Sequence, residues 1–175
     1  MVIPVITMSF LAGMFYTDLK SRLIPIWMYL GLIIAMIVRA ASLYDTSLLA
    51  INTGVNILSI MFLLGGVHLY YWMKNRRLIK ILDQYFGAGD LLFLLISAIY
   101  FSPLMFIVFQ VLSIMLLLLI FGLYILVSGN RNTTIPLAGG QAILVLCFEL
   151  LSVLGIHSWQ YRDDLMAELI FSLFL

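Results

Sequence analysis

Hydrophobic residues dominate the chain in long runs, and the polar residues between these runs are few and clustered. A helix needs about 20 apolar residues to cross the hydrocarbon core of a bilayer. Six stretches approach that requirement, at residues 2–16, 24–42, 48–72, 87–101, 104–127 and 135–155. The pattern predicts an all-α, polytopic membrane protein with six transmembrane helices in one membrane-embedded domain, residues 1–175.

The apolar run over residues 91–127 is too long for one crossing. At 1.5 Å per residue, a continuous helix would extend about 55 Å, or roughly two bilayer cores. Ser102-Pro103 lies where a turn would divide the run, because proline disfavours helical geometry in the residue before it. We therefore expect two helices here, rather than one long helix bent at Pro103.

Composition narrows the class of protein. The chain has 175 residues, of which 65% are hydrophobic and 10% are charged, whereas soluble domains carry about 25% charged residues. A net charge of +1 leaves no basic footprint for nucleic acid. The single cysteine, Cys147, excludes an intramolecular disulfide and a multi-cysteine zinc cluster. We expect no metal and no other cofactor.

The basic residues predict the orientation in the membrane. Most follow the first, third and fifth apolar stretches, and only Arg39 and Arg162 fall on the other side. By the positive-inside rule, the basic loops are cytoplasmic and both termini lie outside. Residues 74–86 and the tail, 156–175, are expected to form interfacial helices on the bilayer surface.

Two acidic residues stand at predicted membrane edges. Asp18 ends the first apolar stretch and Asp90 begins the fourth, with two crossings between them. An even number of crossings returns the chain to the same face, so both carboxylates are expected at the cytoplasmic boundary. Ionisable groups at membrane depth are costly and usually functional. Taken singly, Asp90 could merely cap a helix, and Asp18 could merely pair with Lys20 or Arg22.

A close pair of carboxylates has a specific chemistry. Like charges prevent both from ionising, so the pair shares one proton. The ionised member can take a proton from water while the neutral member polarises a carbonyl, as in aspartic proteolysis. Helix dipoles favour Asp90, near a helix N-terminus, as the ionised member and Asp18, near a C-terminus, as the protonated one.

Three motifs resemble those of one enzyme family. Gly87-Ala88-Gly89-Asp90 resembles the GxGD signature of membrane aspartic proteases. Asp18 with Ile24-Pro25 after it resembles the first-aspartate region of type IV prepilin peptidases, which include archaeal preflagellin peptidases. Residues 135–140 resemble the glycine-containing stretch that opens the last helix of many members. The resemblance covers about residues 10–155.

The resemblance implies an activity and a site. Such enzymes cleave the short basic leader of prepilin-like proteins at the cytoplasmic face of the inner or plasma membrane, just before a hydrophobic helix. Asp18 and Asp90 would be catalytic, with Gly87, Gly89 and Pro25 supporting the motifs. Members that also N-methylate the product carry two CxxC pairs. This chain has a single cysteine and resembles a small, peptidase-only member.

Two positions depart from the family pattern. Ile26 follows Pro25 where asparagine is common, and Leu92 stands two residues after Asp90 where lysine is common. These departures motivate an alternative, a non-catalytic assembly partner of pilin-like proteins. A proton-coupled transporter with Asp18, Asp90 and Glu149 as relay groups is a further alternative.

We also predict roles for several other polar and small residues. Lys20 and Gln141 are candidates for a second layer around the aspartates. Glu149 is expected to be protonated and hydrogen-bonded to a neighbouring helix. Asn56 is expected to bond between helices, and the glycine pairs at 65–66 and 139–140 are expected to permit close helix packing.

Overall fold

The computed structural model describes residues 2–43, 45–76, 87–128 and 136–155, together with residues 163 and 172. Within these residues the chain forms helices and no strands, which confirms the all-α prediction. The helices are α1 (Val2–Ser21), α2 (Ile26–Leu43), α3 (Thr46–Asn75), α5 (Ala88–Tyr100), α6 (Pro103–Ser128) and α7 (Leu137–Val153). The predicted interfacial segments fall almost entirely outside the described residues, as do Arg77, Lys80 and Arg131.

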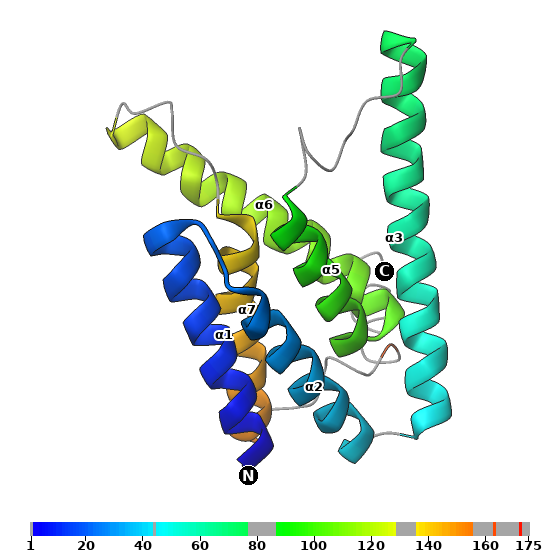
Figure 1. Ribbon diagram of the computed structural model, residues 1–175, viewed down its shortest axis with the longest axis vertical. Coiled ribbons are helices and arrows are strands. Elements are labelled where there is room, and N and C mark those ends of the chain that lie inside the picture. The colour runs from blue at the N-terminus through cyan, green and yellow to red at the C-terminus, as the bar shows by residue number, and fades with distance from the viewer. Residues whose placement is uncertain are drawn as a thin grey trace.

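The helices form one bundle in which successive helices run in opposite directions (Figure 1). The first helix packs most extensively against α7 and also against α2. The next layer is formed by α5 and α6, and α3 lies at the edge of the bundle (Figure 1). One end of the bundle therefore carries the end of α1 and the starts of α2, α5 and α7.

The lengths of the helices confirm part of the prediction of a membrane protein with six crossings. Three helices, α1, α3 and α6, are long and apolar enough to cross a membrane. The others are shorter, and α5, with 13 residues, extends only about 20 Å at 1.5 Å per residue. The helices therefore support a membrane protein, but three of the six predicted crossings do not reach the required length.

The long apolar run divides where the sequence predicted. Helix α5 ends at Tyr100, and α6 begins at Pro103. Proline suits the first helical position, because its missing N–H group would have no partner there. The two residues between the helices let the chain reverse, so the prediction of two helices rather than one bent helix is confirmed.

A stripe of buried residues along α1 explains the burial of Asp18. The stripe recurs at three- and four-residue spacing, which places its members on one face of the helix. Its members are Pro4, Thr7, Leu11, Met14 and Asp18. Asp18 is therefore the last residue of the core-facing stripe, and the α1 helix carries its carboxylate toward the first turn of α7.

Small residues allow α7 to approach its neighbours. A Cβ added at Gly140 would lie 2.4 Å from Leu117 Cδ2, so any other residue there would require the Leu117 side chain on α6 to move. This confirms the close packing predicted for the 139–140 pair. For Gly65 and Gly66 the same prediction is wrong, because a Cβ at either position would meet nothing within 4 Å.

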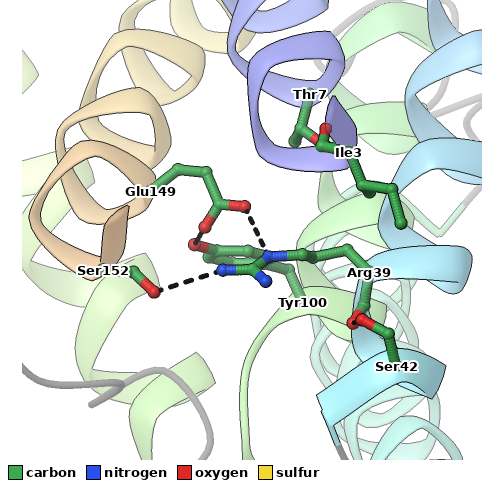
Figure 2. Close-up of polar contacts among 7 residues, drawn as sticks. All are labelled: Ile3, Thr7, Arg39, Ser42, Tyr100, Glu149 and Ser152. Carbon is green, nitrogen blue, oxygen red and sulfur yellow. Dashed lines mark hydrogen bonds and ion pairs between the residues drawn. The ribbon is translucent and has the colours of Figure 1, made fainter. Parts of the chain in front are cut away.

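A buried polar cluster joins α2, α5 and α7 at the end of the bundle away from Asp18 (Figure 2). The Arg39 Nε on α2 lies 3.1 Å from Oε1 of Glu149 on α7, and the Tyr100 hydroxyl on α5 donates to Oε2 at 2.9 Å. Arg39 also donates to the Ser152 hydroxyl. The predicted hydrogen bond of Glu149 to a neighbouring helix is therefore present, and one of its two partners, Arg39, lies at ion-pair distance.

The predicted bond from Asn56 is also present. Its amide Nδ2 donates to the carbonyl oxygens of Ala98 and Phe101, at 2.9 and 2.7 Å. These carbonyls belong to the last turn of α5 and its C-cap, which lack partners within the helix. Asn56 therefore fastens α3 to the end of α5.

Candidate functional site

The first turn of α7 brings the two aspartates together. The Ala138 N–H donates to Oδ1 of Asp90 at 3.0 Å, and the Gly139 N–H donates to Oδ2 of Asp18 at 2.8 Å. Ala138 and Gly139 are consecutive residues, so the two carboxylates are held by adjacent amides of one helical turn. The chain thus places side by side two acids that are 72 residues apart in the sequence.

The physical cause is the unsatisfied N-terminus of α7. The first N–H groups of a helix have no partner within it, and the helix dipole makes this end attractive to anions. Pro136, the N-cap of α7, makes no side-chain hydrogen bond to the helix. The carboxylates of Asp18 and Asp90 supply the missing acceptors. Each carboxylate uses one oxygen for an amide of α7, and the Asp90 carboxylate also accepts a backbone hydrogen bond from Gly87.

The shared contact with α7 bears on which of the two aspartates holds the proton. Helix ends favoured Asp90 as the ionised member and Asp18 as the protonated one. In the structure both carboxylates accept from the same helix N-terminus. The dipole of α7 therefore acts on both carboxylates, and the assignment of Asp90 as the ionised member stays a prediction.

Glycines leave the room that the two carboxylates occupy. A Cβ on Gly139 would lie 2.7 Å from both Cβ and Oδ2 of Asp18. A Cβ on Gly87, the N-cap of α5, would lie 3.0 Å from Oδ2 of Asp90. The small residues flanking the site are needed because backbone and carboxylate approach each other more closely than a side chain allows.

Tyr29 is a third polar group at this end that the sequence did not reveal. It lies near the start of α2, is buried, and interacts electrostatically with both Asp18 and Asp90. A Cβ on Gly89 would lie 2.7 Å from its hydroxyl oxygen. Nothing in the local sequence separates Tyr29 from the other tyrosines, since only the packing of α2 against α5 brings it to the site.

Lys20 and Gln141, predicted to form a second layer around the aspartates, make their contacts with other residues. The Lys20 ammonium lies 3.4 Å from the Tyr16 hydroxyl and over its ring, on the exposed side of α1. Lys20 is two residues after Asp18, about 200° around the helix, and therefore points away from α7. Gln141 directs its amide to Gln110 and Ser113 of α6, not to the aspartates.

The other residues of the motifs and their departures lie near the site but contribute no polar side chain to it. Pro25 immediately precedes α2, and its carbonyl accepts from the Met28 N–H at 3.0 Å. Ile26 is exposed, and Leu92 packs against the hydrophobic core. Neither departure from the family pattern therefore places a polar group beside the carboxylates.

A groove of about 710 Å³ opens beside Asp90. Its walls come from α3, α5, α6 and α7, and most of its lining is apolar. Gln110 and Gln141 also line it. Asp90 lines the groove and Asp18 does not, since Asp18 is covered by the packing of α1 on α7.

The described residues contain no group of three or more His, Cys, Asp or Glu side chains that could hold a metal ion. What the site offers chemically is a pair of carboxylates with a buried phenol beside them. A scan against protein-family models, a search of curated proteins and a search of solved structures find no match to this chain.

Proposed function

We propose that the protein is a membrane aspartic endopeptidase that cleaves the basic leader of prepilin-like proteins at the cytoplasmic face of the inner or plasma membrane. The observation that carries the proposal is the convergence of Asp18 and Asp90 on adjacent amides of α7. The resemblance of residues 87–90 to the GxGD signature supports it independently. The proposal includes six crossings, with the short helices α2, α5 and α7 completing the bundle.

The proposed reaction is hydrolysis without a covalent intermediate. One carboxylate is ionised and takes a proton from a water molecule, which attacks the scissile carbonyl. The other carboxyl is protonated and polarises that carbonyl oxygen. Collapse of the tetrahedral intermediate breaks the C–N bond, and the leaving amine takes the proton that the first carboxylate received from water. The pair then returns to its singly protonated state.

The contacts of Glu149 weigh against the transporter alternative. A relay through Asp18, Asp90 and Glu149 would require Glu149 to exchange protons with the others. Instead Glu149 pairs with Arg39 and Tyr100, near the opposite end of the bundle. One of the three relay groups that the transporter hypothesis requires therefore does not lie with the other two.

Cleavage in a reconstituted system tests the proposed function. The purified chain is placed in phospholipid vesicles with a precursor that has a short basic leader followed by an apolar helix. We expect one cut just before the helix, identified by the mass of the new N-terminal fragment. Asp45→Asn is the matched control, because Asp45 is an exposed carboxylate at the opposite end of the bundle, where it caps α3. An intact precursor after incubation with folded protein would contradict the proposal.

A further inference from the structure

The groove beside Asp90 reaches the carboxylate pair from the side of α3 and α6. The side of Asp18 is closed, because Asp18 is buried and Gly139 lies directly against it. Asp90 lines the groove together with Leu137, which is the first residue of α7. A substrate carbonyl can therefore reach Asp90 from the direction of α3 and α6.

The two sides of the groove differ in chemistry. The α3 side is apolar apart from one hydroxyl, with Leu58, Phe62 and Leu63 among its residues. The opposite side carries the polar groups Asp90, Gln110 and Gln141. The start of a polypeptide helix can match both, with apolar side chains toward α3 and its first N–H groups, which have no partner within the helix, toward the polar side.

The amides of the polar side are fixed in place. Gln110 Nε2 donates to the Ser97 hydroxyl at 2.8 Å, and Gln141 Nε2 donates to Oε1 of Gln110 and to the Ser113 hydroxyl. The network holds both amides against the helices rather than letting them fold away from the groove. These groups already have partners within the protein, so the polar side of the groove is arranged before any occupant binds.

The groove runs along the helices of the bundle, which is the direction in which the membrane-embedded helix of a substrate would lie. It begins at Asp90 and extends along α6 past Val111 and Phe106, toward the opposite end of the bundle. Large apolar side chains on α3 and α6 remain exposed there, including Phe62 at 86%. An apolar helix lying in the groove would cover such side chains and present its end to Asp90.

We propose that the groove between α3 and α6 binds the first turns of the apolar helix of the polypeptide substrate, which enters from the bilayer on the α3 side. This inference rests on the proposed function, because it takes Asp90 to be a reacting group. The occupant is a polypeptide helix, and a bound phospholipid is an outcome that the test distinguishes.

Two neighbouring residues of α6 provide a matched pair of variants. Val111 and Leu112 are similarly exposed, at 52% and 60%, but only Val111 lines the groove. Val111→Trp is expected to raise the KM for the precursor about tenfold with little change in kcat, because it fills the binding space without touching the carboxylates. Leu112→Trp is expected to leave both constants unchanged. An unchanged KM in the Val111→Trp variant would overturn the proposal.

Cross-linking tests occupancy without requiring cleavage. In a chain carrying Cys147→Ser and Asp90→Asn, a cysteine is introduced at position 111 or 112, and the precursor carries one cysteine in its apolar helix. We expect oxidative cross-linking from position 111 and little from position 112. Equal cross-linking, or a phospholipid retained in native mass spectrometry with no cross-link at 111, would overturn the proposal.

The outcomes separate this inference from the proposed function. Cleavage that persists in Asp90→Asn would refute the aspartic peptidase and leave the cross-linking result to decide whether the groove binds the helix. Cleavage that depends on both aspartates but is insensitive to Val111→Trp would refute the groove alone.

Discussion

Asp18→Asn and Asp90→Asn are each expected to reduce cleavage of the precursor by about three orders of magnitude or more, as is usual when one member of a catalytic unit is removed. Asparagine keeps the size of aspartate and an oxygen that can accept the Ala138 or Gly139 N–H, so the contact with α7 can persist. What it cannot do is hold or release a proton at catalytic pH. The measurement is the initial rate of leader release in vesicles.

The same substitutions distinguish a catalytic from a structural role. If the aspartates only cap α7, the asparagine variants should cleave normally, because asparagine and aspartate are comparably good helix caps. Thermal unfolding in detergent serves as the control and is expected to change little. A variant that remains folded and cleaves at the wild-type rate would remove that aspartate from the proposed mechanism.

Glu149→Ala is expected to destabilise the bundle by about 3–5 kcal/mol, the usual cost of removing one partner of a buried ion pair. Glu149 is fully buried, and its two oxygens accept from Arg39 and Tyr100 (Figure 2). Its removal leaves the Arg39 guanidinium, which cannot lose its proton, without the carboxylate that neutralises it. Equilibrium unfolding in detergent, followed by circular dichroism, measures the loss.

Two further variants isolate the charge pair. Glu149→Gln keeps the shape and an acceptor for the Tyr100 hydroxyl, so we expect a smaller loss of stability than for alanine. The double variant Arg39→Met with Glu149→Leu removes both charges and is expected to recover much of the loss, because apolar replacements of a buried pair are often neutral or stabilising. A double variant less stable than Glu149→Ala would contradict the interpretation of the cluster as a buried ion pair.

The hydrophobic pattern was sufficient to predict the helices and the separation of α5 from α6. Long apolar runs have one low-cost arrangement in a membrane, since a helix satisfies its own backbone groups. The parity of the crossings was sufficient to place Asp18 and Asp90 at the same end. The end of α1 was harder to predict, because polar residues continue the helix to Ser21, beyond the apolar stretch that ends at residue 16.

The contacts that define the site depend on packing between distant segments. The Gly139 amide meets a carboxylate 121 residues away, and Arg39 meets a glutamate 110 residues away. Neither spacing has a periodic signal in the sequence. The distribution of basic residues predicts only that Arg39 lies on the outer side of the membrane, and it does not reveal the contact of Arg39 with α7. Tyr29 was missed for the same reason.

Proximity of the two aspartates is the claim on which the account depends, and a cysteine pair measures it without any substrate. In a Cys147→Ser chain, Asp18→Cys and Asp90→Cys are combined and treated with a short bis-methanethiosulfonate reagent. Mass spectrometry of the digested protein then reports whether the two cysteines are joined. The control combines Asp18→Cys with Asp45→Cys, whose positions lie at opposite ends of the bundle (Figure 1). We predict efficient joining of positions 18 and 90 and none of positions 18 and 45. Folded protein in which both cysteines of the 18/90 pair react singly and remain unjoined would contradict the account.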